Sequence, residues 1–293
     1  MGSEMCIRDR VTMLLKPGAE AHSYEPSPKD IQAIGKSDLF VYTGGDSDEW
    51  VDGMLSSIDK SKLKTLKMMD TVKLYEEEMS EGMQEEEHEH HHDDKDSHDK
   101  EHHHDDKEHH HHDGEEGPEM DEHVWTSPAN AIQIVKALTE TISGLDKDNA
   151  QTYQKNAEAY IAKLEKLDKD FHDVIDHAKR KEIIVGDRFP FLYFAKEFGL
   201  TYYAAFPGCS TDTEANPATI AFLVDKVKED HIPVVFHIEM SNEQMSKAIA
   251  EATGAKNELL NAVHNVSDEE FKKGVTYIDL MNHNVKVLKE ALN

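Results

Sequence analysis

Two histidines stand in short loops that each precede a predicted helix. His22 lies in PGAEAHSYEP, after a predicted strand and a turn at Gly18, and His123 lies in DEHVWTSP, just before a helix that starts near Ser127. Open α/β sheets place their ligands in such loops, at the carboxyl ends of strands. A neutral imidazole is a good ligand for Zn²⁺ and for other borderline divalent cations. A single loop histidine is more often an ordinary surface residue, so either motif alone leaves both interpretations open.

A second group of histidines lies in an acidic segment. Residues 76–122 contain 22 Asp and Glu but only 3 Lys, and 12 of the 20 histidines lie between His88 and His112. No apolar periodicity runs through this segment, which predicts a disordered loop at about 76–122. One interpretation is a solvated linker, but histidines interleaved with carboxylates favour a loop that collects divalent metal weakly. The loop histidines to which we assign this role are His90, His91, His92, His102, His103, His104, His109, His110, His111 and His112.

The rest of the composition excludes several classes of protein. A formal net charge of −28 excludes a general nucleic-acid binder, because neutralising phosphates requires a basic surface. The chain has no apolar run of about 18 residues, so no direct membrane span is predicted. Two cysteines, Cys6 and Cys209, exclude a disulfide scaffold and an all-cysteine zinc site. Residues 1–10 are polar and match nothing that follows, so we expect a non-native leader and a chain without its export signal.

Strands and helices alternate on both sides of the acidic loop. Before the loop, the patterns predict strands at 11–15 and 39–43, a short strand within 63–72, and helices at 26–34 and 50–58. After it, they predict helices at 127–143, 191–198, 217–228, 242–253 and 268–292, and strands at 183–186, 202–206 and 234–238. One long helix without Gly or Pro is predicted over 146–179. We therefore expect an α/β fold of two parallel-sheet lobes, residues 11–145 and 180–293, joined by one long rigid helix.

The two histidine motifs and the insertion between them together resemble a known family. The segment PGAEAHSYEPSPKDI, the His-rich acidic insertion and DEHVWTSPANA are similar to the cluster A-I solute-binding proteins, which include zinc-binding lipoproteins and adhesin-like proteins. The resemblance runs from Val11 to Asn293 and lacks only the family's first strand and helix. It implies a receptor of an ABC importer, with a metal site between two lobes to which His22 and His123 contribute.

The resemblance also shows where this chain departs from the family. The family's third ligand is a histidine at the position of Arg188, and a guanidinium cannot bind a cation. Asp187 is the substitute if the loop shifts by one residue, and Gly186 would let the backbone approach the cleft closely. The alternative is that Asp187 pairs with Arg188 or caps the helix that follows.

The fourth ligand is also altered. The family places an acidic residue where this chain has Asn261, and His264 follows three residues later. Asparagine is a poor zinc ligand and imidazole a good one, so we assign His264 to the site. Glu239, at the end of a predicted strand, is a candidate for hydrogen-bonding a ligand. The predicted metal ligands are therefore His22, His123, Asp187 and His264.

Three histidines and one carboxylate suit tetrahedral Zn²⁺, while Mn²⁺ would favour more oxygen ligands. The implied function is an extracytoplasmic receptor that captures Zn²⁺ as its transported ligand and presents it to the transmembrane subunits of an ABC permease, as a monomer and not as an enzyme. A manganese receptor of the same fold and a zinc buffer remain alternatives. A metallohydrolase is a weaker alternative, because a catalytic zinc keeps a water and needs a general base.

Overall fold

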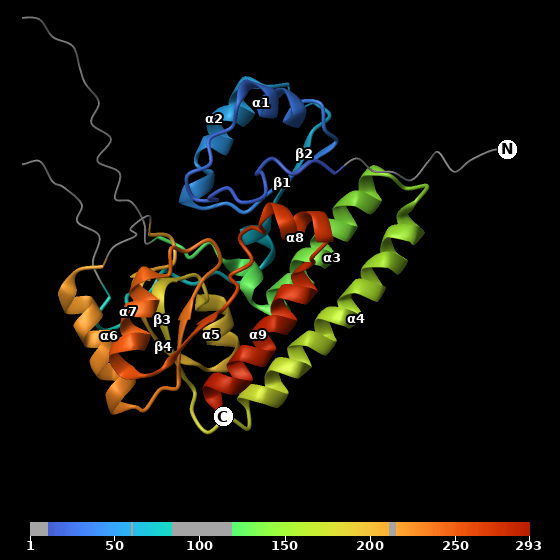
Figure 1. Cartoon of the computed structure of the whole chain (residues 1–293). Coiled ribbons are helices and arrows are strands. Elements are labelled where there is room, and N and C mark those ends of the chain that lie inside the picture. Colours follow the sequence, from blue (N-terminus) through green and yellow to red (C-terminus); the bar gives the residue numbers. More distant parts are fainter. Residues whose placement is uncertain (1–10, 60, 84–118, 211–214) are drawn as a thin grey trace, which may run out of the picture.

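The computed structural model describes residues 11–59, 61–83, 119–210 and 215–293 (Figure 1). The expected leader at 1–10 and the metal-collecting histidines between His88 and His112 lie outside these residues. None of the described helices combines the length and the apolar character needed to cross a bilayer.

The N-terminal lobe is small and lies apart from the larger body at the top of Figure 1. Its elements are α1 (Pro28–Ile34), β1 (Leu39–Tyr42), the 3₁₀ helix η1 (Asp46–Asp48), α2 (Trp50–Ser57), β2 (Lys64–Lys67) and the 3₁₀ helix η2 (Met68–Thr71). The two strands pair in parallel, with Leu39 opposite Lys64. Ser27 caps α1 through a capping box, which explains why the helix starts there. The buried core of this lobe consists of Ile34, Phe40, Val51, Met54 and Leu63.

The C-terminal lobe is built on a four-stranded sheet. Its elements are β3 (Glu182–Phe189), α5 (Leu192–Phe198), β4 (Thr201–Pro207), α6 (Pro217–Glu229), β5 (Val234–His237), α7 (Gln244–Thr253), β6 (Lys256–Leu259), α8 (Asp268–Lys273) and α9 (Tyr277–Leu292). The strands are all parallel, in the order β4-β3-β5-β6. Two parallel-sheet lobes, predicted from the alternation of strands and helices, are thus confirmed.

Two long helices form a hairpin beside this sheet (Figure 1). Between the lobes, a short 3₁₀ helix, η3 (Val124–Thr126), leads into α3 (Pro128–Leu145), which Ser127 caps. After α3, α4 (Ala150–Ile175) runs as one unbroken helix against α3 and α9, starting four residues later than predicted. Four side chains of α4 at three- and four-residue spacing are fully buried: Leu164, Leu167, Phe171 and Ile175.

Two sequence expectations about elements are wrong, and one about a strand is confirmed. Residues 11–15 form no strand; Val11 is 89% exposed and pairs with no described strand. The short strand expected within 63–72 is confirmed as β2, which ends at Lys67 and is followed by η2. The helix expected over 268–292 is two helices, because Gly274 adopts a left-handed φ of +70° and ends α8.

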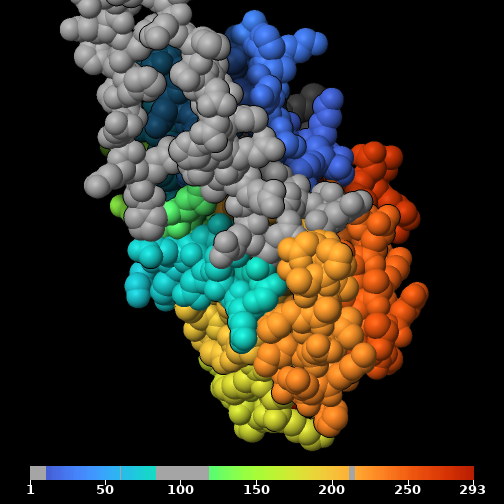
Figure 2. Space-filling model, turned by 90° about the vertical axis from the view of Figure 1, so that its left-hand side faces the viewer, coloured from blue at the N-terminus to red at the C-terminus, as the bar shows by residue number. Residues whose placement is uncertain are grey.

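Both ends of the segment predicted as a disordered loop lie within the described residues. Glu76 and Met120 form an antiparallel bridge, and the backbone N–H of Asp121 donates to the carbonyl of Tyr75 at 3.0 Å. Figure 2 shows the stretch that ends at residue 83 lying against α6. There Gly82 contacts the ring of Phe222 so closely that a Cβ would stand 2.1 Å from a ring carbon. Residues 76–83 and 119–122 are therefore an ordered stem and not part of a loose loop.

Candidate metal site

Three imidazole rings meet between the two lobes. One nitrogen from each of His22, His123 and His264 lies within 4.8 Å of the other two. The Nε2 atoms of His22 and His123 are 3.3 Å apart, and the ring centroids of the three histidines are separated by 4.9–5.3 Å. Two nitrogens that share a tetrahedral zinc ion at ~2.0–2.1 Å stand roughly 3.3–3.4 Å apart. The three side chains are therefore within reach of a single ion.

The loop before α1 positions His22 and is fastened to the opposite lobe. The turn at Gly18, whose φ is +77°, lets its N–H donate to the carbonyl of Val266 at 2.8 Å. The side-chain amide of Asn265 donates to the carbonyls of Lys16 and Ala19 at 2.7 and 2.9 Å. These bonds tie the His22 loop to the loop that carries His264.

The other nitrogen of His22 faces oxygen. Its Nδ1 is 3.0 Å from the hydroxyl of Ser47 and 3.9 Å from Oε2 of Glu122. Ser47 is in η1, and its backbone N–H donates to Oε1 of Glu122 at 2.7 Å. Gly45 makes this possible, because its φ is +83° and a Cβ would stand 2.5 Å from that carboxylate oxygen. The Gly44-Gly45 turn after β1 thus makes room for the group that orients His22.

His123 is completely buried and is held by Asp121. One carboxylate oxygen of Asp121 accepts from the backbone N–H of His123 at 2.8 Å and from its Nδ1 at 3.1 Å. The phenol of Tyr193 on α5 donates to the carbonyl of Asp121 at 2.8 Å. With the proton on Nδ1, the lone pair of Nε2 faces His22. This carboxylate–histidine pair has the geometry that commonly orients metal-binding histidines.

Glu239, which follows β5, holds His264. Its Oε1 accepts from the backbone N–H of His264 at 2.7 Å and from Nδ1 at 3.3 Å, and its Oε2 accepts from the N–H of Ala262 at 2.7 Å. Val263, between these two donors, has a φ of +62°, which is strained for a β-branched residue. This conformation aims both N–H groups at one carboxylate. Nε2 of His264 is buried and has no hydrogen-bond partner, as expected of a ligand atom.

The surroundings of His22 and His123 favour the neutral form of these two rings. Burial, and then the neighbouring His123, His264 and Arg188, lower the pKa of His22 to about 3. Burial also lowers the pKa of His123, against the opposing charge of Asp121. Burial raises the pKa of Glu239, but the hydrogen bonds from His264 and from the backbone outweigh it and lower the pKa overall. A neutral ring offers its lone pair to a cation, whereas a protonated ring cannot.

Asp187 lies in β3, at the irregularity between Val185 and Arg188, and is 7% exposed. Its Oδ1 accepts from the N–H of Arg188 at 2.9 Å, while its Oδ2 is buried without a partner. It does not cap α5, which has no side-chain cap. Asp187 is not among the three side chains grouped within 4.8 Å, so the structure leaves its ligand role a prediction.

Gly186 and Arg188, on either side of Asp187, make packing and ion-pair contacts. Gly186 packs against α7, where a Cβ would stand 2.6 Å from Cα of Ser246, so the glycine serves helix packing and not access to the cleft. Arg188 links the two lobes, because its guanidinium donates to Glu20 at 3.2 Å and to the carbonyl of Ser210 at 3.2 Å.

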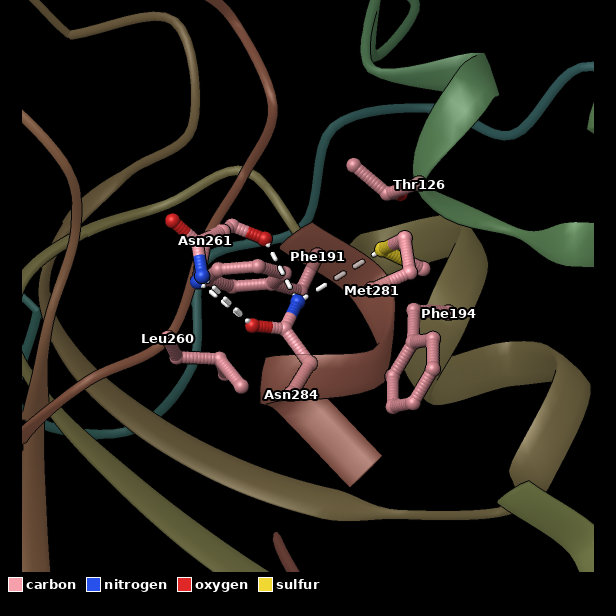
Figure 3. Close-up of a pocket in the computed structure, with 7 residues that line it drawn as sticks. All are labelled: Thr126, Phe191, Phe194, Leu260, Asn261, Met281 and Asn284. Carbon is pink, nitrogen blue, oxygen red and sulfur yellow. Dashed lines mark hydrogen bonds between the residues drawn. The ribbon is translucent and has the colours of Figure 1, made fainter. Parts of the chain in front are cut away.

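The side chain of Asn261 is hydrogen-bonded to Asn284. In the close-up of Figure 3 Asn261 points toward Asn284 of α9. Its backbone N–H and its side-chain amide both donate to the side-chain oxygen Oδ1 of Asn284, at 2.8 and 3.1 Å. The Asn284 amide donates back to the carbonyl of Asn261 at 2.8 Å. This buried exchange joins α9 to the loop after β6. Histidines outside the cluster bond elsewhere: His237 to Asn257, His283 to the carbonyl of Leu259, and His172 to Asp176.

Four residues that surround His22 and His123 were not predicted from the sequence: Asp121, Ser47, Glu122 and Cys209. His22, Glu122 and Cys209 form a second group whose ligand atoms lie within 4.8 Å of one another. Burial, and then the charges of Glu77, Asp121 and Glu122, raise the pKa of the Cys209 thiol. An acid two residues before a candidate histidine, as in Asp121-x-His123, was the available signal for Asp121.

Known proteins resemble this chain over nearly its whole length. High-affinity zinc uptake system protein ZnuA of Bacillus subtilis (strain 168) is 35% identical over 99% of the chain and 83% of its own length. Zinc-binding lipoprotein AdcA of Streptococcus pneumoniae (strain ATCC BAA-255 / R6) is 33% identical over 96% of the chain. The chain spans about half, 51%, of the length of that AdcA.

Solved structures show the same fold. The metal-dependent lipoprotein YcdH of Bacillus subtilis matches with a TM-score of 0.75 and 31% identity, covering 98% of this chain and 93% of that one. The Zn(II)-bound ZnuA-like domain of Streptococcus pneumoniae AdcA matches with a TM-score of 0.71 and 30% identity, covering 95% and 89%. The family described as "Zinc-uptake complex component A periplasmic" matches residues 8–291. A match over this span, together with the three converging imidazoles, shows that the chain belongs to the ZnuA family.

Proposed function

We propose that this protein is an extracytoplasmic receptor that captures Zn²⁺ between its two lobes and delivers it to an ABC-type permease. One observation carries the proposal: each of three buried histidines has Nδ1 against an oxygen, which leaves Nε2 for the ion. The family description and the zinc-related names of the relatives support the same assignment. Three nitrogens favour Zn²⁺ over Mn²⁺, which prefers oxygen ligands.

A receptor fits these surroundings better than a hydrolase. Asp121 and Glu239 each accept hydrogen bonds from a histidine and from backbone N–H groups, and Glu122 accepts from Ser47. Carboxylates engaged in this way orient ligands and are poorly placed to take a proton from a substrate water. Delivery to the permease subunits, as a monomer, is the remaining part of the proposal.

Removal of one ligand histidine tests the site. His123→Ala and His264→Ala should each weaken Zn²⁺ binding at least about 100-fold, since losing even an orienting partner of a ligand costs up to that much. Isothermal titration with residues 85–116 deleted removes competing sites, and His172→Ala on the exposed face of α4 is the matched control. Unchanged affinity in both site variants would refute the site. Retention of the tight equivalent after the deletion excludes a buffer that resides in the loop.

Asp187 is the proposed fourth ligand, supported by its buried and unpartnered Oδ2. Asp187→Ala should weaken Zn²⁺ binding at least about 10-fold, and Asp187→His should restore it, because either side chain can supply a donor atom. If Asp187→Ala binds as tightly as the parent, the fourth position belongs to water or to another group.

Import is tested in cells of the source organism. A strain without this gene should grow poorly in chelator-treated medium, and the parent gene should restore growth while the His123→Ala gene should not. Equal rescue by both genes would contradict the role of the site in import.

A further inference from the structure

An acidic cavity of about 260 Å³ adjoins His22 but neither of the other two histidines of the cluster. Its walls carry the carboxylates of Asp46, Glu77, Glu119 and Glu122 and the thiol of Cys209. Grouped carboxylates attract a cation into such a cavity from solution. The cavity is therefore a route by which a cation can approach His22.

Three different ligand types meet at this cavity. A ring nitrogen of His22, a carboxylate oxygen of Glu122 and Sγ of Cys209 lie within 4.8 Å of one another. Nδ1 of His22 is 3.9 Å from Oε2 of Glu122, and both side chains are 5% exposed. Ser47 occupies only Oε1 of Glu122, which leaves Oε2 for an ion. A zinc shell would bring such donors to roughly 3.3–3.7 Å, so small side-chain movements would complete the site.

This group uses a different nitrogen of His22 from the three-histidine centre. Nε2 faces His123, whereas Nδ1 faces Ser47 and Glu122. A neutral imidazole has one lone pair and one N–H, so it serves one ion at a time. With an ion on Nδ1, the Nε2 proton can be donated to His123 across the observed 3.3 Å. With an ion on Nε2, the Nδ1 proton can be donated to Ser47 across 3.0 Å.

We propose that His22, Glu122 and Cys209 form a second cation site, an entry site, which binds a soft or borderline divalent cation such as Zn²⁺ and passes it through His22 to the three-histidine centre. Only the direction of this transfer rests on the proposed receptor function. Binding at the entry site replaces the thiol proton by the metal, so one sulfur–metal bond forms while one proton leaves to water. Hand-over breaks the metal's bonds to Cys209, to Glu122 and to Nδ1 of His22, and it forms bonds to Nε2 of His22, His123 and His264. The thiol regains a proton from water, and the ring of His22 loses its proton from Nε2 as Nδ1 gains one.

Cobalt is a direct probe of the thiol. In a full-length chain carrying Cys6→Ser and His264→Ala, Co²⁺ should produce a near-ultraviolet thiolate-to-metal charge-transfer band. Adding Cys209→Ala should abolish it, and histidine-rich segments cannot mimic it because they hold no sulfur. Release of about one proton per bound ion should accompany the band. Absence of the band while Cys209 is present would overturn the entry site.

Transfer is tested by the rate of loading. Trp125 lies 5.5 and 5.7 Å from the rings of His123 and His264, so its fluorescence reports occupation of the centre. In stopped-flow mixing with Zn²⁺, Cys209→Ser should slow both loading and release about 10-fold, because an entry site lies on the path in both directions. Cys6→Ser is the control and should change neither rate.

The outcomes separate the two proposals. If the parent holds one tight Zn²⁺ and Cys209→Ser loads and releases it at parental rates, the entry site is refuted and the receptor function stands. If the parent holds no tight Zn²⁺ while the cobalt band appears, the receptor function is refuted and the entry site stands as a separate cation site.

Discussion

The two lobes differ in how securely they are folded. The C-terminal lobe packs a four-stranded sheet against long helices, and its core contains fully buried Phe171, Phe206 and Phe236. The N-terminal lobe has a two-stranded sheet over a small apolar cluster. Small cores stabilise a fold weakly, so we infer that the N-terminal lobe opens more readily than the rest.

Because of this difference, the three histidines of the metal site are held by lobes of unequal stability. His123 and His264 are held by partners anchored to α5 and β5 in the larger lobe, whereas His22 comes from the smaller one. An ion shared among them would fasten the weaker lobe to the stronger one.

Core truncation should show the largest difference between the lobes. Phe171→Ala should cost about 3–5 kcal/mol of global stability, because it leaves a cavity in the large core. Phe40→Ala should instead increase hydrogen exchange only within residues 28–67. Mass-spectrometric hydrogen exchange with urea unfolding checks both. Equal loss of protection in β3 and β5 from the two variants would show that the lobes unfold together.

Zinc should act mainly on the smaller lobe. At a free concentration about 100 times its dissociation constant, a ligand adds about 2.7 kcal/mol to the stability of the state that binds it. We expect slower hydrogen exchange in α1 and α2 on adding Zn²⁺, with little change in β3. His22→Ala should remove that protection. If Zn²⁺ slows hydrogen exchange equally in both lobes, the inferred difference in stability between the lobes is contradicted.

A change of pH should have a smaller effect on stability, and this effect should arise in the larger lobe. Burial, together with the charge of Asp168 on α4, raises the pKa of Glu197 on α5 to about 7. A carboxyl whose pKa is higher in the folded state binds more protons there, so stability falls as pH rises from about 4.5 to about 7. Glu197→Gln should therefore gain roughly 1 kcal/mol relative to the parent at pH 8 but not at pH 4, allowing for partial exposure.

The control for this prediction is Glu165→Gln, an exposed carboxylate one turn before Asp168. Thermal melting at several pH values measures both variants. If the melting temperatures of the parent and of the Glu197→Gln variant change in parallel across this pH range, the raised pKa of Glu197 is refuted.

Local signals in the sequence were sufficient for most of the fold. Ser127-Pro128 marks the start of α3, and the left-handed Gly254 ends α7, because capping is a local interaction. The pattern failed at residues 11–15, where apolar residues suggested a strand but no described strand is there to pair with them. It also failed at Gly274, which lies inside an otherwise helical pattern.

The site was only partly accessible from the sequence. Residue type and loop position singled out His22 and His123, and the family resemblance added His264. The structure brings the three together, while their role as ligands stays a prediction. The surroundings of His22 could not be predicted, because Ser47 meets Glu122 across 75 residues of sequence. Cys209, far from His22 in the sequence, likewise lies near it in the structure and donates its backbone N–H to Glu77 of the stem. Such contacts depend on the tertiary fold, and they produce no periodic pattern in the sequence.

The ordered stem at Glu76 and Met120 has a consequence for protein engineering. Glu76 and Met120 are bridged on either side of residues 84–118, so an insert placed between them joins the body of the protein at this same pair of residues. Doubling or halving the length of a flexible insert changes the closure free energy by only about 0.6 kcal/mol. A fluorescent domain could therefore replace residues 84–118, and its brightness would report changes in the adjoining acidic cavity. The same two attachment residues would allow a series of metal biosensors that differ only in the domain inserted between them.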